Sequence, residues 1–282
     1  MLTRVAAGPF HVVGVSVGGV YTSLSVPELD VIFDVGIAPR SFVGQKHLLI
    51  SHGHADHIGS LTSLLGVRGL SRSAPPRIFL PAEIADDVRE AVARLQHVQR
   101  RGFELEFIAV APEEEHALYG DLSARVFRTL HTVPSVGYSL FRRVQKLRAE
   151  FVGLAGGEIR SRRQAGEDLF EFVERTELAY ATDTLVDVLD EQPSLLEARV
   201  LVLECTFLDD RKGRGESRDK CHIHLDEILE RADTFQNEHL VLMHFSQLYQ
   251  PAEVHEILKR RVPAHLQERL VVCAPQRGAW AG

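Results

Sequence analysis

The sequence contains few cysteines, and none are spaced in pairs. Only Cys205, Cys221 and Cys273 occur among its 282 residues. An odd, sparse count argues against the disulfide framework of a small secreted protein and favours a reducing compartment. It also excludes a zinc site built on cysteine pairs. A chain of this length buries about 75% of its unfolded surface in one compact unit, so it needs no disulfide for stability.

Long hydrophobic runs and an excess of positive charge are also absent. No stretch approaches the ~20 apolar residues of a membrane span, and residues 1–5 do not begin a signal peptide. We therefore predict a cytoplasmic protein without a membrane partner. Its net charge is −7, from 39 acidic and 32 basic residues. A polyanionic partner must therefore be held by a local basic patch.

The sequence has no repeat, low-complexity tract or proline-rich linker. Its 45% hydrophobic and 25% charged residues are ordinary for a globular protein. We predict a single domain over residues 1–282. The glycines at 14, 18 and 19 are spaced wrongly for a dinucleotide fingerprint or a P-loop. They predict a β-turn with close backbone approach and no nucleotide cofactor.

Short β-branched runs alternate with amphipathic segments along the chain. The predicted strands are Thr22–Val26, Val31–Val35, His47–Ile50, Arg77–Leu80, Leu122–Leu130, Leu178–Ala181, Val200–Cys205, Leu240–His244 and Leu270–Ala274. The predicted helices are His57–Leu65, Glu83–Arg94, Leu225–Phe235 and Ala252–Arg261. Early strands follow one another through short turns, and later strands alternate with helices. This order predicts a layered α/β fold with helices on the outer faces of the sheets.

Four side chains of metal-ligand type occur within six residues. His52, His54, Asp56 and His57 follow an apolar strand and precede a predicted helix. Because alternate residues of an extended segment share a face, His52 and His54 are able to bind one ion while Asp56 and His57 reach a second. The alternative is four solvated loop residues, but their density between two apolar elements favours a metal site.

Three further ligand-type residues follow predicted strands. His131, Asp183 and His244 each stand at a strand end, so they are able to converge on one edge of a sheet. Taken alone, each is as well explained as a surface or core residue as it is as a metal ligand. Together with the first cluster they complete two sets of three or four ligands, in which a carboxylate at Asp183 is able to bridge two ions. Two such cations activate a shared water, which predicts hydrolysis of an ester or phosphodiester.

The segment Ser51–Gly59 resembles the His-x-His-x-Asp-His signature of the metallo-β-lactamase superfamily. Within it, the chain is most similar to ribonuclease Z, the tRNA 3′-processing endoribonucleases, in their short plant-type form. The similar motifs are Ile32–Gly36, His131–Tyr138, Lys146–Leu147, Phe151–Leu154, Thr182–Thr184, Glu204–Leu208, His222–His224 and His244–Ser246. The resemblance implies a four-layer αββα sandwich.

The resemblance also implies a role for each ligand. One zinc ion would be held by His52, His54, His131 and Asp183, and a second by Asp56, His57, Asp183 and His244. Manganese or iron would fit the same ligands. Asp56 would orient or deprotonate the attacking water.

The resemblance further implies a proton donor. His222 would give a proton to the leaving 3′ oxygen, with Glu204 holding its ring. A carboxylate partner raises the pKa of a histidine toward the range that such an acid needs. His224 is the alternative donor. If neither histidine is functional, the two are surface residues that cap the following helix.

The implied substrate is precursor tRNA, cut just after the discriminator base by a homodimer. Expected substrate contacts are Ser135, Gly137, Tyr138 and Ser246, and a basic arm over about 142–170 with Arg142, Arg143, Lys146, Arg160, Arg162 and Arg163. With Arg148, the segment Arg142–Arg163 has seven basic residues against Glu150 and Glu158. The alternative interpretation is a solvated helix face.

Two positions depart from the family pattern. Thr182 replaces a glycine before the bridging aspartate, and Leu248 replaces an arginine. The second change removes a charge-assisted contact typically worth ~1.5–3 kcal/mol.

Other activities remain open from the sequence alone. A hydrolase of small molecules, such as a phosphodiesterase, thioesterase or lactonase, would use the same metal ligands. A β-lactamase is disfavoured because no cysteine ligand stands at the position of Asp183. A catalytically silent binding module predicts missing ligands, whereas all seven are present.

Overall fold

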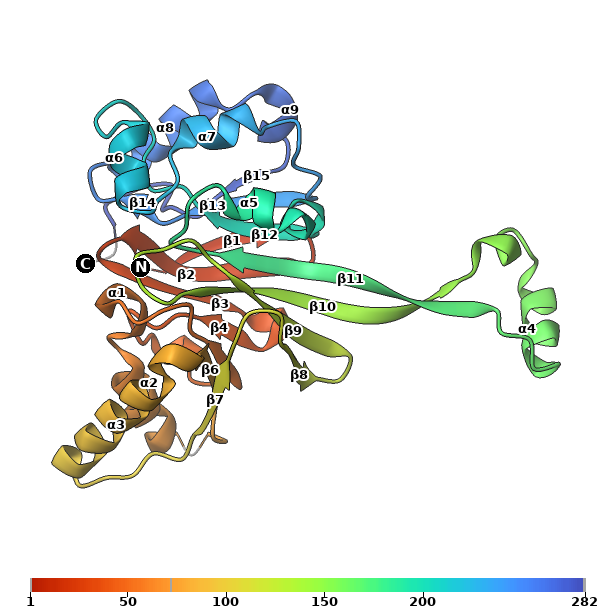
Figure 1. Cartoon of the computed structure of the whole chain (residues 1–282), viewed down its shortest axis with the longest axis horizontal. Coiled ribbons are helices and arrows are strands. Elements are labelled where there is room, and N and C mark those ends of the chain that lie inside the picture. Colours follow the sequence, from red (N-terminus) through yellow and green to blue (C-terminus); the bar gives the residue numbers. More distant parts are fainter. Residues whose placement is uncertain (1, 72, 281–282) are drawn as a thin grey trace.

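Two β-sheets pack face to face between two groups of helices in the computed structural model, which describes residues 2–71 and 73–280 (Figure 1). The first sheet has the order β1-β2-β3-β4-β5-β6-β7, with β14 beside β2. The second has the order β15-β13-β12-β11-β10-β9-β8. The predicted αββα sandwich is therefore confirmed. No helix within the described ranges is both long and apolar enough to cross a membrane.

The first sheet comes mainly from the N-terminal part of the chain. Its strands are β1 Thr3–Ala7, β2 Phe10–Gly18, β3 Tyr21–Val26, β4 Val31–Phe33, β5 His47–Leu49, β6 Arg77–Pro81, β7 Glu106–Val110 and β14 Phe245–Ser246. Strands β1 to β4 are antiparallel, and β4 to β7 are parallel. The helices on its outer side are α1 Ala55–Ile58, α2 Leu61–Leu70 and α3 Ala82–Gln99 (Figure 1).

The second sheet comes from the rest of the chain. Its strands are β8 Glu115–Tyr119, β9 Leu122–Arg128, β10 Val136–Leu147, β11 Phe170–Ala181, β12 Val200–Glu204, β13 His239–Met243 and β15 Leu270–Val272. The helices on its outer side are α5 Val188–Glu191, α6 Arg214–Asp219, α7 Leu225–Glu230, α8 Pro251–Arg261 and α9 Ala264–Gln267. Short 3-10 turns lie at Pro27–Leu29, Arg40–Phe42, Ala149–Phe151 and Pro193–Glu197. Strands β11, β12, β13 and β15 are parallel, so their carboxyl ends meet at one edge.

The predicted elements are all present, but their boundaries differ. The predicted helix His57–Leu65 is divided between α1 and α2, and Ser60 at the break donates its hydroxyl to the carbonyl of Gly36. The predicted helix Leu225–Phe235 ends at Glu230 and continues as turns. Strands β1, β2, β7, β8, β10 and β14 were not predicted.

The inner faces of the two sheets share one hydrophobic core. Phe33 of the first sheet stacks on Tyr180 of the second, with ring centroids 4.4 Å apart. Leu24 and Tyr138 are buried in the same cluster, both at 0% exposure. Separate apolar clusters lie beneath the two groups of outer helices. One apolar interior therefore joins the two sheets.

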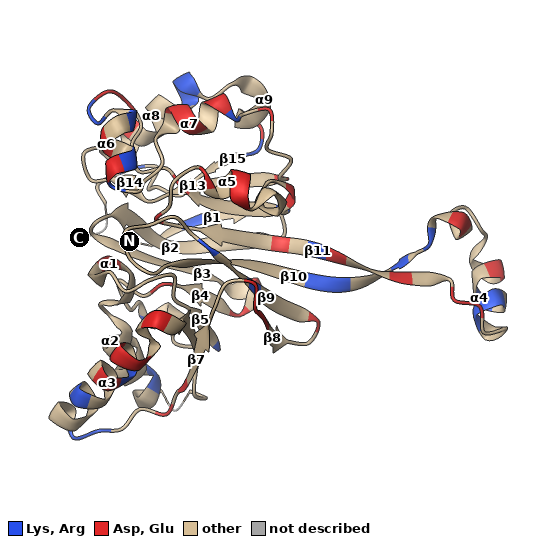
Figure 2. Cartoon of the chain, viewed as in Figure 1, with Lys and Arg blue, Asp and Glu red and all other residues tan. Residues whose placement is uncertain are grey.

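The distal parts of β10 and β11 extend out of the sandwich as a hairpin that ends in α4 Gly156–Gln164, which we call the arm (Figure 1). Its positive charge is smaller than the segment Arg142–Arg163 indicates. Over residues 142–175, eight basic residues stand against six acidic ones, because residues 164–175 add Glu167, Asp168, Glu171 and Glu174. Figure 2 shows both signs along the arm. The predicted arm is present and net basic over residues 142–170, with seven basic residues against four acidic ones, but acidic residues partly offset its charge.

A buried carboxylate lies at the root of the arm. The register of β10 with β11 shifts between Leu140 and Phe141, and the additional residue on β11 is Glu177. Glu177 is only 2% exposed and accepts hydrogen bonds from Arg175 and Arg199 at 2.8 and 2.9 Å. Its carboxylate therefore ties the arm to the start of β12.

We expect Glu177→Gln to lower the free energy of unfolding by roughly 2 kcal/mol, because a buried acceptor of charge-assisted hydrogen bonds becomes neutral. The partner arginines are partly exposed, which limits the loss. Thermal unfolding measures the change. Glu174→Gln, on an exposed pair of the same arm, is the control and should cost less than about 1 kcal/mol. Equal losses in both variants would contradict a special role for the buried carboxylate.

Candidate metal centre

The loop after β5 presents the first ligands and is fixed by a buried aspartate. The backbone N–H and hydroxyl of Ser51 donate to Asp34 at 2.7 and 2.9 Å. Tyr180 donates its hydroxyl to the same carboxylate at 2.7 Å, and His57 Nδ1 lies 2.9 Å from it. Asp34 therefore orients one candidate ligand and the loop that bears the others. No role was predicted for Asp34 from the sequence, although a carboxylate that follows an apolar strand is a usable signal.

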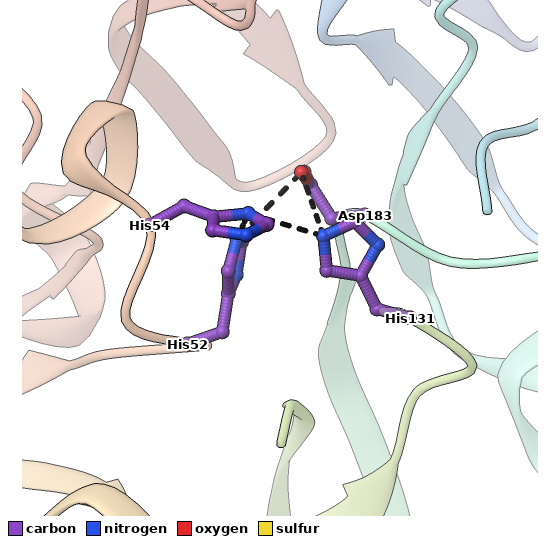
Figure 3. Close-up of side chains that lie close together, drawn as sticks. All are labelled: His52, His54, His131 and Asp183. Carbon is purple, nitrogen blue, oxygen red and sulfur yellow. Dashed lines mark hydrogen bonds and ion pairs between the residues drawn. The ribbon is translucent and has the colours of Figure 1, made fainter. Parts of the chain in front are cut away.

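The first predicted ligand set converges in the structure (Figure 3). His54 Nδ1 lies 3.0 Å from His52 Nε2 and 3.2 Å from His131 Nε2. Asp183 Oδ2 lies 3.7 Å from the Nε2 atoms of both His52 and His131. Four ligands about 2.1 Å from one tetrahedral zinc ion lie roughly 3.4 Å apart. The four side chains therefore suit one ion with little movement.

Two histidines of the second predicted set lie at the other oxygen of Asp183. Its Oδ1 atom lies 3.3 Å from His57 Nε2 and 3.2 Å from His244 Nε2. Asp56 Oδ2 lies 3.6 Å from His57 Nε2. Asp183 thus faces both sets, as a bridging carboxylate requires.

Two buried nitrogens in the second set support a cation there. Nε2 of His57 and Nε2 of His244 have no hydrogen-bond partner among the described residues, although both side chains are 0% exposed. Unsatisfied buried polar atoms are costly, so such atoms point to a missing partner. These nitrogens, with two carboxylates, are a donor set that divalent metal ions accept. The centre therefore fits divalent metal binding.

The Nδ1 atoms of His52 and His244, on the side of each ring away from the centre, form hydrogen bonds. Ser51 Oγ lies 2.9 Å from His52 Nδ1, and Thr206 Oγ1 lies 3.0 Å from His244 Nδ1. Such contacts fix the orientation of a ligand ring. Thr182, one of the two departures from the family pattern, donates its hydroxyl to Asp183 Oδ1 at 2.8 Å and so orients the bridging carboxylate.

Backbone strain is concentrated at the same residues. Asp34, Asp183 and His244 each follow a strand and have φ of 56, 43 and 61°. Non-glycine residues rarely adopt this conformation, and functional sites account for many that do. The turn aims each side chain away from the strand direction and toward the centre.

A glycine allows the metal loop to approach β4. A Cβ atom on Gly36 would lie 2.0 Å from the carbonyl oxygen of Asp56. The predicted close approach at Gly18 is also present, because a Cβ there would lie 3.1 Å from the His244 carbonyl. Both contacts bring ligand-bearing segments against the first sheet.

The charges of the centre suit a cation. Burial lowers the pKa of His52, His131 and His244, so these rings are neutral and free to bind metal. Burial also lowers the pKa of His57, but the carboxylates of Asp183 and Asp34 outweigh it and raise the pKa to about 9. His57 is therefore protonated at neutral pH in the metal-free protein.

We expect metal binding at neutral pH to release a proton, because a cation at His57 Nε2 must displace the one held there. Metal affinity should therefore rise with pH up to about 9, the pKa of His57. Calorimetric titration with Zn²⁺ in two buffers of different ionisation enthalpy measures the release. Equal apparent enthalpies in the two buffers would contradict it.

Beside the metal ligands, His222 and Glu204 form a hydrogen-bonded pair. His222 Nδ1 lies 2.9 Å from Glu204 Oε1, and the His222 ring centroid lies 5.5 Å from that of His131 and 5.4 Å from that of His244. Glu204 is 0% exposed and also accepts the Thr206 hydroxyl at 2.6 Å. Burial lowers the pKa of His222, but the carboxylate of Glu204 outweighs this and raises it to about 9.

The other histidine of this motif has a different environment. His224 is 1% exposed, and its Nδ1 accepts the backbone N–H of Asp226 at 3.1 Å as the cap of α7. Its Nε2 lies 3.3 Å from the carbonyl of Asp209. Both ring nitrogens are thus engaged by the backbone. The geometry favours His222 over His224 as a proton donor.

The end of α6 directs His222 toward the centre. Cys221 has φ of 56°, and the His222 backbone N–H donates to the Ser217 carbonyl at 3.0 Å. This is a left-handed helix end of the kind that usually carries glycine. The buried hydroxyl of Ser217 donates to the His222 carbonyl at 2.6 Å. The turn thereby fixes the backbone of His222.

The residues predicted to contact substrate differ in their exposure to solvent. Tyr138 is 0% exposed and donates its hydroxyl to the Ile50 carbonyl, so it is a core residue and the expected substrate contact is wrong. Gly137 faces Phe127, whose ring would lie 2.2 Å from an added Cβ. Ser135 and Ser246 are each 8% exposed.

The predicted basic contacts are also unequal. Arg142 pairs with Asp121, Arg143 with Glu115, and Arg162 with Glu158. Three other predicted contacts have no ion-pair partner within residues 2–71 and 73–280: Lys146, Arg160 and Arg163. These three are therefore the freer cations of the arm.

Leu248 stands where the family has an arginine, but the side chain of Arg211 lies nearby. The Leu248 side chain is 46% exposed. The Arg211 guanidinium lies 4.3 Å from the ring centroid of Tyr249 and donates to the Leu248 carbonyl at 3.3 Å. A guanidinium from a different loop thus lies beside residue 248.

Comparison with known proteins identifies the family. The model of the β-lactamase superfamily domain matches residues 36–245. tRNase Z TRZ1 of Arabidopsis thaliana is 34% identical over 256 residues, which cover 90% of this chain and 91% of that protein. The chain belongs to the tRNase Z family. A second tRNase Z of that plant, the chloroplastic TRZ2, is 33% identical over 88% of this chain and 70% of its own length.

Solved structures agree with this assignment at the level of the fold. The short form of human tRNase Z has a TM-score of 0.59 and 17% identity over 93% of this chain and 95% of its own. The metallo-β-lactamase fold protein YhfI from Bacillus subtilis has a TM-score of 0.60 and 17% identity over 95% and 97%. Members of the tRNase Z family are hydrolytic endoribonucleases, so this family member is an enzyme of that class.

Proposed function

We propose that this tRNase Z family member hydrolyses precursor tRNA at the phosphodiester 3′ of the discriminator base, removing the 3′ trailer. The observation that carries the proposal is the Glu204–His222 pair beside two converging ligand sets. The ligand sets suit hydrolysis in general. The pair adds a proton donor, which a poor leaving group such as a ribose 3′ oxygen requires.

Each residue has a chemical role in this proposal. His52, His54, His131 and Asp183 would hold one zinc ion, and Asp56, His57, Asp183 and His244 the other. When bound, two cations lower the pKa of a water molecule and stabilise negative charge on the reacting phosphodiester. Asp56, whose side chain is 15% exposed, accepts a proton from the attacking water.

Proton donation completes the reaction. His222 gives its proton from Nε2 to the leaving 3′ oxygen, because Nδ1 is engaged by Glu204. Glu204 is held in turn by the backbone N–H groups of Thr184 and Ile223, at 2.8 and 3.2 Å. The pair is therefore rigid and keeps Nε2 directed toward the centre.

We further propose that the arm binds the tRNA body and that the enzyme acts as a homodimer, as the family resemblance implies, and that it is cytoplasmic. Lys146, Arg160 and Arg163 have no ion-pair partner in the described part of the chain, so they offer positive charge for this contact. Because the acidic residues of the arm reduce its net charge, binding should depend on these few cations. Zinc is the proposed ion, with manganese or iron able to use the same ligands.

Cleavage of end-labelled precursor tRNA tests the proposal. We expect the zinc-loaded protein to cut at one phosphodiester, just after the discriminator base. Asp56→Ala should abolish this cut, and Arg94→Ala, on an exposed part of α3, should not. Hydrolysis of bis(p-nitrophenyl) phosphate without cutting or binding of RNA at low salt would instead support the small-molecule hydrolase.

A further inference from the structure

A cavity of about 260 Å³ opens beside the candidate metal centre. It lies between the first turn of α3, the segment after β7, and the segment that joins β9 to β10. His131 forms part of its wall, so the cavity adjoins the first ligand set. Its volume is below the ~300 Å³ of a typical ligand pocket, so it suits one planar group rather than a whole substrate.

The first turn of α3, whose Glu83 borders this cavity, also contacts the loop after β5 that bears His52 and His54. The Ile84 side chain lies 3.5 Å from the position of a Cβ on Gly53, between His52 and His54. The cavity is therefore next to the place where a phosphodiester bound at the first ligand set would lie. A neighbouring nucleotide of the same strand would reach it.

Two opposite charges line the cavity without partners. Arg128, the last residue of β9, and Glu83, in the first turn of α3, are both exposed. Neither side chain forms a hydrogen bond or an ion pair with any residue in the described part of the chain. By contrast, Arg125 on the same strand is held by Glu115 and Glu174. The free donor and the free acceptor are thus both available to a ligand.

We propose that this cavity is a subsite that reads the base of a nucleotide adjoining the scissile phosphodiester. Arg128 donates to a ring nitrogen or carbonyl oxygen of the base, and Glu83 accepts from an exocyclic amino group. A phosphate group fits less well, because the carboxylate of Glu83 repels it. The inference rests on the proposed RNA substrate and adds base selection to it.

The proposal makes a specific statement about uracil. Guanine, adenine and cytosine each carry an amino group that a carboxylate accepts, whereas uracil has none. A uracil in the cavity offers Glu83 no amino group, and its ring N3–H lies between two carbonyl oxygens that repel the carboxylate. We expect the enzyme to cleave precursors with uracil at this position about tenfold less efficiently than those with the other bases.

Two sets of precursor tRNA test the subsite with the zinc-loaded full chain. One set carries each of the four bases on the 5′ side of the scissile bond, and the other set varies the 3′ side. The measured quantity is kcat/KM for each precursor. We expect the uracil penalty in one of the two sets, which identifies the side. Glu83→Gln, whose amide both donates and accepts, should reduce the uracil penalty to about twofold or less. Arg128→Ala should reduce the differences in kcat/KM among the four bases.

Controls separate this role from a general effect. Arg94→Ala removes an exposed positive charge elsewhere on α3 and should keep the wild-type base preference. The melting temperature should be unchanged in all three variants, and Arg94→Ala should also keep the wild-type hydrolysis of bis(p-nitrophenyl) phosphate. Absence of a base preference in the wild type, or variants that slow all precursors equally, would overturn the subsite. If the wild type cuts none of the precursors, the proposed function itself fails.

Discussion

His222→Ala is expected to lower the rate of precursor tRNA cleavage by roughly 10²–10⁴-fold while changing the hydrolysis of bis(p-nitrophenyl) phosphate only a few-fold. A ribose 3′ oxygen leaves as a strongly basic alkoxide unless it receives a proton. p-Nitrophenolate is a stable anion that leaves without one. The two substrates therefore separate loss of the proton donor from loss of the metal centre.

The pH dependence of RNA cleavage gives an independent measure of this role. The pKa of His222 is raised to about 9 in the metal-free protein, so the ring is protonated below that value and loses its proton as pH rises through it. Bound cations beside the ring lower this pKa. We expect kcat/KM for RNA to fall on the alkaline side at or below about pH 9, and this fall should be absent in His222→Ala.

The matched control is His224→Ala. His224 caps α7, so this change should cost about 1 kcal/mol of stability and leave the ratio of the two activities unaltered. An equal loss of both activities in His222→Ala would show that the ring supports the metal centre instead. A selective loss in His224→Ala would transfer the role to that residue.

The ligand-bearing residues were predictable because each has a local signature. His52, His54, Asp56 and His57 form a dense cluster between apolar elements, and Asp183 and His244 follow apolar runs. The carboxyl ends of adjacent parallel strands meet, so strand order alone brings the last two together. The structure adds what no local pattern contains: the two oxygens of Asp183 face different ligand sets.

Other features depend on contacts between segments distant in sequence, which a single sequence does not reveal. Asp34 binds Tyr180, 146 positions away, and the role of Tyr138 in the core follows from its contact with Ile50. The charge around the arm also depends on such pairing. Residues 142–163 are basic, but the pairing of β10 with β11 places Glu171 and Glu174 beside them.

Asp183→Asn is expected to lose most bound metal and to lower both activities by more than about 100-fold. Changes at residues that merely orient a ligand typically cost 10–100-fold, and Asp183 faces both ligand sets directly. The amide keeps the size of the side chain but removes its negative charge and one acceptor oxygen. Two cations a few ångströms apart then lack the charge that offsets their repulsion.

Metal content and activity measured on the same preparation test this prediction. After dialysis, we expect the wild type to retain two zinc ions per chain, consistent with two ligand sets, and Asp183→Asn to retain fewer than one. Asp190→Asn, an exposed carboxylate on α5 that pairs with Arg231, is the control and should match the wild type. Because RNA and bis(p-nitrophenyl) phosphate both require the metal centre, Asp183→Asn should lose both activities together, unlike His222→Ala. Full metal retention with full activity would show that the two sets do not depend on a shared carboxylate.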